Sequence, residues 1–372
     1  MTTTKPLAMR WARRSIKASP SPEGQNASPG ANSSRTWAGD IRTQSTVLVV
    51  TCRFDPHADA VIDALDSLGV PALRLNSEDL LTEHSFVWRS EVGERISVAS
   101  ARDSQASVSL GAATLTGYYR TPSQVASPAT ITCAAGGVFA RSEGEAFFDC
   151  LYALEGIRWF PPPYLIRPAE AKIPQLQLAK RLGLRIPRTI VTNDPAEARA
   201  FIRELRFDVA VKPLKTSHVA VGEASYEIYT RRLSPHDLEE HIEAVRWAPT
   251  MLQEYIPKLS EFRVIVIGAN IFAVEIDSQS VPGAEIDWQE VDPFTVPHRP
   301  TTLPDNLVTR LRRFLDSYGL VFGAIDLLRN PEGDFIFLEN NPNGQWYWLE
   351  VLTGLPMAAS MARLLTGRCT EG

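Results

Sequence analysis

Two apolar segments near the end of the chain, 321–328 and 335–339, predict a hairpin that brings two acids together. With a two-residue turn at 332–333, Asp326 lies directly opposite Glu339 on the neighbouring strand. The residues around both acids are apolar, which favours a position beside a core over a solvated pair near a turn. The spacing therefore predicts two facing carboxylates at the end of a sheet.

A third oxygen-bearing side chain belongs to this pair. Asn341 lies two residues beyond Glu339 and therefore continues the same face of the strand. Two facing carboxylates repel each other unless a cation lies between them. Magnesium suits such a site, because it binds oxygen ligands through one or two carboxylates together with the phosphates of a substrate. We therefore expect Asp326, Glu339 and Asn341 to be metal ligands.

Two lysines have the positions that phosphate binding requires. Lys172 lies near the start of a predicted helix over 169–182, and Lys212 ends an apolar strand directly before Pro213. A lysine that ends a buried strand can reach into a cleft and pair with phosphate. The alternative for each one is an exposed lysine that extends from an edge of the fold.

Between two blocks of the chain, segment 251–256 forms an extended apolar run. Such a run can offer backbone N–H and C=O groups to an adenine ring, although an ordinary strand is an equal alternative. Arg263 follows in the next strand and could bind a carboxylate or phosphate with two N–H groups. Its alternative role is an ion pair with a neighbouring acid.

The elements that position these residues predict an α/β (α+β) fold in blocks. A buried strand over 46–51, a helix over 58–68 and a strand over 71–75 form a β-α-β unit, which implies a parallel sheet. Further on, the pattern predicts short strands between about 85 and 120, helices over 141–154, 169–182 and 304–318, a small α+β unit over 188–256 with a hairpin over 219–229, a hairpin over 261–277, and two short helices at the end.

Composition excludes several classes of protein. The chain has 372 residues, of which 44% are hydrophobic and 22% charged, and its net charge is −5. This charge argues against a nucleic-acid partner, and no apolar run is long enough for a membrane span. The four cysteines are scattered, as in a reduced cytoplasmic protein. Residues 1–45 hold seven Lys/Arg against two acids and few large apolar residues, so we expect a disordered basic tail.

Taken together, these features resemble the ATP-grasp superfamily from about residue 46 to 365. More closely, the sequence is similar to the ATP-grasp ribosomal peptide maturases, the graspetide or microviridin-type ligases. The most specific match is Leu338-Glu-Asn-Asn-Pro-Asn-Gly-Gln-Trp346, followed by Leu352-Thr-Gly-Leu-Pro356. Other matching strings are Val47-Leu-Val-Val-Thr51, Tyr118-Tyr-Arg-Thr-Pro122, Glu170-Ala-Lys172, Pro187-Arg-Thr189, Gln253-Glu-Tyr255, Glu261-Phe-Arg263 and Phe322-Gly-Ala-Ile-Asp326.

The resemblance implies an ATP-grasp fold, with an N-terminal parallel-sheet domain over 46–165 and two α+β blocks over 166–256 and 257–372 that clasp ATP. It assigns Lys172 and Lys212 to the phosphates and Arg263 to the acceptor carboxylate or acyl phosphate, with Arg263 and Lys212 as the catalytic residues. The remaining nucleotide ligands that it implies are Gln253, Glu254, Tyr255, Ile256 and Glu261, the last of these for the ribose. One or two Mg²⁺ ions would be held by Asp326, Glu339 and Asn341.

The function that the resemblance implies is an ADP-forming carboxylate–amine or carboxylate–hydroxyl ligase in the cytoplasm. It would phosphorylate Asp or Glu side chains of a ribosomal precursor peptide, with a leader and an acidic core, and close ester or amide cross-links. The alternatives are a RimK-like ligase that adds free amino acids to a peptide or protein, and a non-catalytic module that binds ATP or a peptide. The sequence leaves the oligomeric state open, with a homodimer as one alternative.

Overall fold

A parallel sheet opens the main part of the chain, in the strand order β3-β2-β7-β8. Its strands are β2 (Val47–Thr51), β3 (Ala72–Asn76), β7 (Leu115–Tyr119) and β8 (Ile157–Phe160). The computed structural model describes residues 7, 9, 13–15, 46–92, 96–100, 107–110, 115–215, 218–221 and 224–368. The predicted β-α-β unit is confirmed, because helix α1 (Pro56–Ser67) connects β2 to the parallel neighbour β3.

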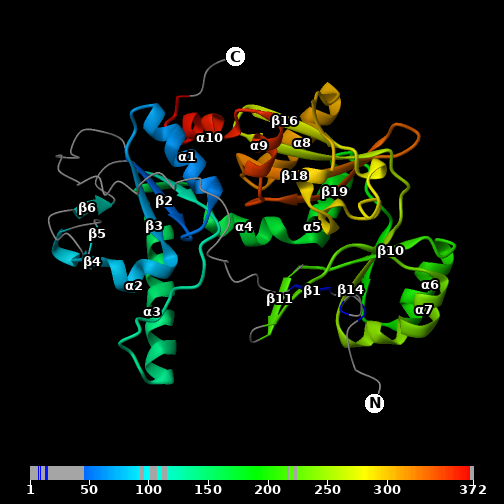
Figure 1. Cartoon of the computed structure of the whole chain (residues 1–372), viewed down its shortest axis with the longest axis horizontal. Helices are drawn as coiled ribbons and strands as arrows, with labels where there is room; N and C mark the ends of the chain where they lie inside the picture. The colour runs from blue at the N-terminus through cyan, green and yellow to red at the C-terminus, as the bar shows by residue number, and fades with distance from the viewer. Residues whose placement is uncertain are drawn as a thin grey trace.

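Beside this sheet lies a small antiparallel sheet of the order β4-β5-β6. Its strands are β4 (His84–Trp88), β5 (Ile96–Ser100) and β6 (Ser107–Leu110). Helix α3 (Ala134–Tyr152) begins seven residues before the expected start at 141, and Figure 1 shows it projecting from this block. The pair Gly136-Gly137 near its start has low helix propensity, which hid this first part from the sequence pattern.

Two helices replace the single helix expected over 169–182. Helix α4 (Pro163–Glu170) and helix α5 (Lys172–Arg181) are separated by Ala171, whose backbone is extended at φ −67° and ψ 108°. The break places Lys172 at the first position of α5. Lys172 is therefore near a helix start, as expected, but the helix begins at Lys172 and not at residue 169.

The central block is built around a four-stranded antiparallel sheet of the order β13-β10-β14-β9. Its elements are β9 (Thr189–Thr192), α6 (Pro195–Glu204), β10 (Val209–Lys212), β13 (Arg231–Arg232), α7 (Pro235–His241) and β14 (Thr250–Glu254). A hairpin of β11 (His218–Val221) and β12 (Ala224–Glu227) extends from it, as the alternating pattern predicts. Helix α7 starts at a capping box in which Ser234 and Asp237 each bond the other's backbone N–H.

The C-terminal block is a five-stranded antiparallel sheet of the order β17-β16-β15-β18-β19. Its strands are β15 (Ser260–Ile267), β16 (Asn270–Ile276), β17 (His298–Thr301), β18 (Phe322–Arg329) and β19 (Phe335–Asn341). Helix α8 (Asp305–Ser317) packs on it through Leu311 and Phe314, which are fully buried. Helices α9 (Tyr347–Thr353) and α10 (Met357–Leu365) close the chain.

The turn between β18 and β19 differs from the predicted two-residue loop. Arg329 pairs with Phe335, so the loop spans residues 330–334. The register then shifts between Asp326 and Leu327, because Leu338 is an extra residue on β19. The longer loop and the bulge offset each other, and Asp326 lies opposite Glu339 after all.

The expectation of a wholly disordered tail over 1–45 is wrong at two places. Residues Arg13–Ser15 form strand β1, which pairs with β12, and the side chain of Leu7 is fully buried. A segment that pairs its backbone and buries an apolar side chain offsets the entropy of ordering. The rest of 1–45, apart from Met9, lies outside the described residues.

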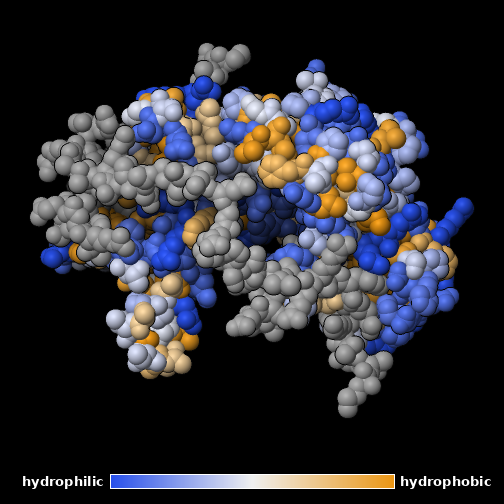
Figure 2. All heavy atoms as spheres, viewed as in Figure 1, coloured by the Kyte–Doolittle hydropathy of each residue, from blue (hydrophilic) through white to orange (hydrophobic). Residues whose placement is uncertain are grey.

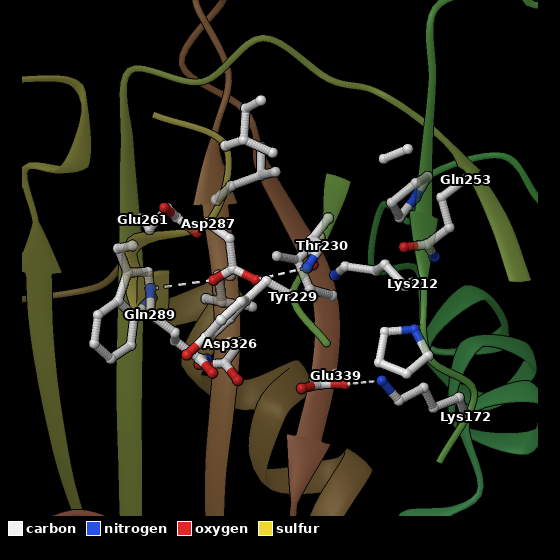
Figure 3. A pocket seen from close by; sticks show the side chains of 18 of the residues that line it. Lys172, Lys212, Tyr229, Thr230, Gln253, Glu261, Asp287, Gln289, Asp326 and Glu339 are labelled. Carbon is white, nitrogen blue, oxygen red and sulfur yellow. Dashed lines mark hydrogen bonds and ion pairs between the residues drawn. The ribbon is translucent and has the colours of Figure 1, made fainter. Parts of the chain in front are cut away.

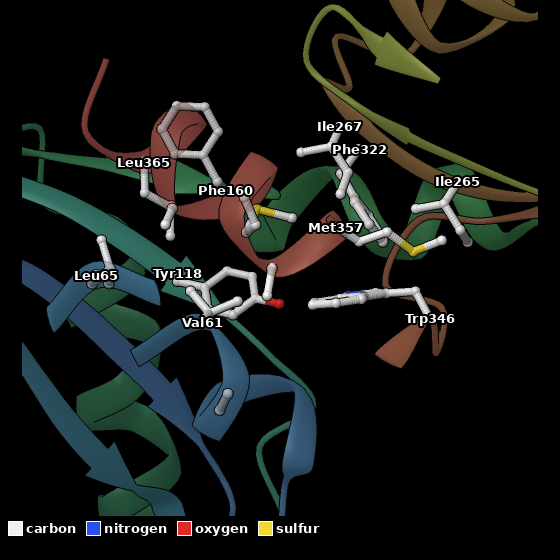
Figure 4. Packing of buried hydrophobic residues seen from close by; sticks show 14 of the residues in the cluster. Val61, Leu65, Tyr118, Phe160, Ile265, Ile267, Phe322, Trp346, Met357 and Leu365 are labelled. Carbon is white, nitrogen blue, oxygen red and sulfur yellow. The ribbon is translucent and has the colours of Figure 1, made fainter. Parts of the chain in front are cut away.

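One apolar cluster joins the first block to the last (Figure 4). It brings Val61 and Leu65 of α1 together with Trp346, Met357 and other residues of the C-terminal helices. Within it, Trp346 is fully buried. Among the described residues, no helix is long and apolar enough to cross a membrane.

Candidate functional site

A cavity of about 420 Å³ lies between the central sheet and the C-terminal sheet. On the face shown in Figure 2, the surface is hollowed near its centre, and the residues within the hollow are mostly hydrophilic. Ten of the eleven site residues predicted from the sequence line this cavity: Lys172, Lys212, Gln253, Glu254, Tyr255, Ile256, Glu261, Asp326, Glu339 and Asn341. Segments far apart in the sequence are thus brought around one space.

The predicted acid pair lies on the C-terminal wall of the cavity. Asp326 and Glu339 are directly opposite on β18 and β19, and Asn341 lies on the same face. The Asn341 Nδ2 atom is 3.2 Å from Asp326 Oδ2 and 3.5 Å from Glu339 Oε1. The amide therefore bridges the two carboxylates, as the period of two along a strand requires.

Both lysines face this wall from the other side (Figure 3). Lys172 Nζ lies 2.8 Å from Glu339 Oε2 and forms an ion pair with it. The Lys212 side chain extends from the end of β10 toward the same space. Within the described residues, no hydrogen bond or ion pair engages the Lys212 ammonium, which is thus available to an anion.

Burial and neighbouring charges move the pKa values of these groups in different directions. Burial lowers the pKa of Lys212 and raises the pKa of Asp326, the latter against the opposing effect of Arg263. Burial also disfavours the Glu339 carboxylate, but Lys172 and Lys212 outweigh it and lower the pKa of Glu339 to about 2. Glu339 is therefore the firmly ionised member of the acid pair at neutral pH.

Arg263 is the predicted residue that does not line the cavity. It lies opposite Asp326 on the adjacent strand β15, and its Nη1 atom donates to both Asp326 carboxylate oxygens at 2.8 and 2.7 Å. Its Nη2 atom donates to the Gln345 carbonyl at 3.1 Å. The side chain is 8% exposed and lies behind the acid pair as seen from the cavity.

The segment over residues 340–346, which carried the most specific resemblance, is held by residues of both preceding blocks. Gln175 of α5 bonds both backbone groups of Asn340, at 2.7 and 2.8 Å. Arg120, just after β7, donates to the Asn343 carbonyl at 2.6 Å. His57 of α1 accepts from the Trp346 N–H at 3.0 Å.

Glycine is required inside this segment. A Cβ atom at Gly344 would lie 2.6 Å from Ala324 Cβ and 2.9 Å from Asn341 Cβ, which is closer than real contacts allow. It would also lie 3.0 Å from the Arg263 guanidinium. The chain can therefore pass close behind the acid pair only because residue 344 has no side chain.

The predicted adenine segment borders the cavity on the central side. The N–H of Glu254 donates to the Arg188 carbonyl at 2.8 Å, and the N–H of Tyr255 to the Asp208 carbonyl at 3.0 Å. These bonds fix the segment to β9 and β10. Glu261 is buried on β15, where Lys258 Nζ lies 2.7 Å from its Oε1 atom; burial raises the pKa of Glu261 and Lys258 opposes this.

Several lining residues were missed at the sequence level, of which Asp287 is the most informative. Its Oδ2 atom accepts from the Thr230 N–H at 2.9 Å, a bond between the long loop after β16 and the central block. Figure 3 shows this bond between Asp287 and Thr230, with Thr230 next to the end of the Lys212 side chain. Asp287 lies in a polar loop without periodicity, so no sequence pattern marked it.

The donor set suits a hard divalent cation. Two carboxylates supply oxygen atoms on one wall, with the Asn341 amide donating to both, and this matches the preference of magnesium for carboxylate oxygens completed by phosphate. No cluster of three or more His, Cys, Asp or Glu side chains occurs in the described part of the chain, so the protein offers only two acids to such an ion. A softer metal would need nitrogen or sulfur ligands.

Comparison with solved structures gives the same fold over most of the chain. A Chryseobacterium gregarium RiPP-associated ATP-grasp ligase, solved with ADP and a leader and core peptide, aligns with a TM-score of 0.79 and 27% identity over 88% of this chain and 98% of that chain. The macrocyclase MdnC from Microcystis aeruginosa, bound to the precursor peptide MdnA, aligns with 0.74 and 26% over 87% and 100%. The macrocyclase MdnB of the same organism aligns with 0.66 and 27% over 88% and 100%. No protein-family model and no curated protein sequence matches the chain.

Proposed function

Because the chain belongs to the ATP-grasp ligases that act with ribosomally made peptides, we propose that it activates carboxyl side chains of such a peptide with ATP. The activated Asp or Glu is then captured by a hydroxyl or amine of the same peptide. An ester or amide cross-link forms, and ADP and phosphate are released. The peptide would carry a leader and an acidic core, and the cytoplasm, which supplies ATP, would be the site of the reaction.

The observation that carries this proposal is the unpaired Lys212 ammonium, which faces the acid pair across one cavity. The Lys212 side chain is partly buried, and a cation that is withdrawn from water without a partner is destabilised unless an anion joins it. Together, Lys212 and Lys172 suit the phosphates of ATP, with the acid pair on the opposite wall for Mg²⁺. We propose accordingly that blocks 166–256 and 257–372 clasp the nucleotide, with 46–165 as the preceding domain.

Hydrogen bonds within the protein limit which groups could contact the adenine and the ribose. The N–H groups of Glu254 and Tyr255 donate to the protein itself, so adenine recognition would use the carbonyls of this segment and the N–H of Ile256. Gln253 lines the same wall, and its Nε2 atom donates to Thr189 Oγ1 at 3.0 Å. Glu261 would receive the ribose, and its bond to Lys258 fixes the direction of its carboxylate.

In the first step, a peptide carboxylate oxygen attacks the γ-phosphorus, and the bond to the β-phosphate oxygen breaks. Lys172 and Lys212 would stabilise the charge that builds on the transferring phosphoryl group. In the second step, a hydroxyl or amine attacks the acyl carbon, loses its proton, and phosphate leaves with the former carboxylate oxygen. Mg²⁺ held by Asp326, Glu339 and Asn341 would supply electrostatic stabilisation of the phosphates.

Arg263 would act in this scheme mainly through Asp326. Its Nη1 atom is occupied by both oxygens of that acid, so it fixes the carboxylate in place and compensates its charge. A guanidinium in this position can serve the acceptor carboxylate or the acyl phosphate only after its bonds to Asp326 are exchanged. Arg263 remains our candidate for that second role.

The test is incubation of the purified protein with ATP, magnesium and the peptide encoded beside its gene. Each cross-link should lower the peptide mass by one water and release one ADP. Hydroxylamine should trap the activated side chain as a hydroxamate. A mass gain equal to a free amino acid would instead support the RimK-like alternative, and release of AMP would reject both.

A further inference from the structure

Strand β1, residues Arg13–Ser15, pairs with a strand that is distant from it along the sequence. It is the outer strand of the three-stranded sheet β1-β12-β11 and runs antiparallel to β12. The register places Arg13 opposite Glu227 and Ser15 opposite Ser225. More than two hundred residues separate the two strands, although β11 and β12 alone already form a complete hairpin.

A second contact holds the same N-terminal segment. The side chain of Leu7 is fully buried in the apolar cluster of the central block, with Ala198, Ile202 and Leu238 among its members. Residues 5–17 also hold five Lys or Arg and no acid. The segment therefore combines a paired strand with an apolar anchor, as peptides that add a strand to a sheet edge do, and it is also positively charged.

The edge that β1 covers adjoins the proposed active site. The hairpin begins at His218 and leads into Ile228, Tyr229 and Thr230, and all four residues line the cavity. An uncovered strand edge presents a row of N–H and C=O groups that pairs with any extended peptide, largely independent of sequence. Figure 1 shows this sheet below the helices α4 and α5; β12 lies between β1 and β11.

We propose that the outer edge of β12 is a docking site for a peptide strand and that the N-terminal segment, anchored by Leu7 and paired through Arg13–Ser15, is its occupant, supplied by the chain itself. The inference rests on the proposed function in one respect, since an enzyme that acts on peptides can use a strand edge to hold them. Because the occupant is covalently attached, its effective concentration is high, and a separate peptide of the same kind has to displace it. Docking is thus intramolecular in this chain.

A disulfide tests the strand pairing. Ser15 and Ser225 are direct partners across β1 and β12, and the distances between paired residues permit a disulfide. We expect S15C/S225C to form an intramolecular disulfide under mild oxidation. The matched control S15C/Y226C shifts the partner by one residue to the other face of the strand and should not form it. Equal yields in both variants, or none in either, would overturn the pairing.

Competition tests the docking itself. A fluorescein-labelled peptide of residues 1–20 is titrated with the full-length chain and with the full-length variant L7D/R14P, in which the tethered segment cannot bury its anchor or pair. We expect the labelled peptide to bind the variant at least about 10-fold more tightly than the unaltered chain. A labelled peptide that carries L7D should bind neither protein.

Equal affinity for both proteins, or binding to neither, would overturn the proposal. A circular dichroism spectrum of L7D/R14P verifies that the variant is folded, and the disulfide experiment stands if it is not. Neither experiment contains ATP or measures turnover. A failure here therefore leaves the ligase proposal intact, and a failed turnover assay leaves the docking result intact.

Discussion

Two clusters of titratable side chains contact the 340–346 segment, and they are chemically alike. At the wall of the cavity, Asp326 lies beside Glu339 and pairs with Arg263, which itself does not line the cavity. Beyond the carboxyl ends of the parallel strands β2 and β7, Arg120 Nε lies 3.7 Å from Asp55 Oδ2, beside His57. Both clusters contain an acid whose ionised form is favoured, since neighbouring charges and hydrogen bonds lower the pKa of Glu339 and of Asp55 to about 2.

The two clusters differ in how many of their hydrogen-bonding and charged groups lack a partner within the described residues. Both Asp55 oxygens accept bonds from the chain, from Thr51 Oγ1 at 2.6 Å and from the His57 N–H at 3.0 Å. Asp55 is 5% exposed, and no cavity adjoins it among those described above. In the other cluster, Lys212 has no partner within the described chain, and the acids face 420 Å³ of space. A lowered pKa alone therefore does not mark a site; unused binding capacity at a cavity does.

The largest effect should follow from neutralising the acid pair. D326N and E339Q keep the size of each side chain but remove a charge toward the proposed Mg²⁺, so turnover should fall by at least about 100-fold. The control is E332Q, an exposed acid in the loop of the same hairpin, which should keep full activity. Near-normal activity of D326N or E339Q at ordinary magnesium concentration would contradict the assignment of that residue.

The next effect concerns the unpaired ammonium. K212M keeps most of the side-chain volume but removes the charge, so the affinity for ATP should fall by about 10-fold to 100-fold, as the loss of a charged hydrogen bond predicts. K215M changes an exposed lysine at the rim of the same cavity and should weaken binding much less. Isothermal titration with a non-hydrolysable ATP analogue measures both variants. Equal losses would mean that general positive charge, and not Lys212, holds the phosphates.

Much of the site could be predicted from the sequence because strand geometry is periodic. Counting residues across the predicted hairpin placed Asp326 opposite Glu339. The observed loop is longer and Leu338 forms a bulge, which such a count cannot predict. The pairing of Arg263 with Asp326 needed the order of strands in the sheet, which is set by tertiary packing. The bond between Arg120 and Asn343 joins residues 223 positions apart, so neither periodicity nor propensity could reveal it.

The buried cluster should affect stability and spare catalysis. The pKa of Asp55 is lowered from 3.8 to about 2: burial opposes ionisation, but the bonds from His57 and Thr51 and the charge of Arg120 outweigh it. This carboxylate then stabilises the fold above pH 3.8 by about 2 kcal/mol, and the contribution is lost as the pH falls toward 2. D55N should lower the free energy of unfolding by about this amount at pH 7, measured with urea. A large loss of kcat in the folded variant would contradict the division between the two clusters.

The smallest effect is the pH dependence of stability that His57 contributes. Its Nε2 atom accepts from the Trp346 N–H at 3.0 Å, which requires a neutral ring whose proton is on Nδ1, toward Asp55. Burial lowers the pKa of His57, Arg120 lowers it further, and Asp55 opposes both. A lowered pKa in the folded state means that the unfolded chain takes up the proton first. The contribution of His57 to the free energy of unfolding should therefore be fully present above about pH 6.5 and decline below it, by at most about 1.4 kcal/mol per pH unit.

The variant H57Q tests this pH dependence. Because a glutamine can accept from Trp346 and donate to Asp55 without titrating, H57Q should lack the His57 contribution to the loss of stability between pH 7.5 and 5.5. His84 and His298 also have lowered pKa values, but they are present in both proteins, so the difference between the two melting curves isolates His57. Parallel curves would show that the bond to Trp346 tolerates protonation of His57. The buried cluster could then accept a further proton, and it would resemble the cavity in having binding groups that are not fully used.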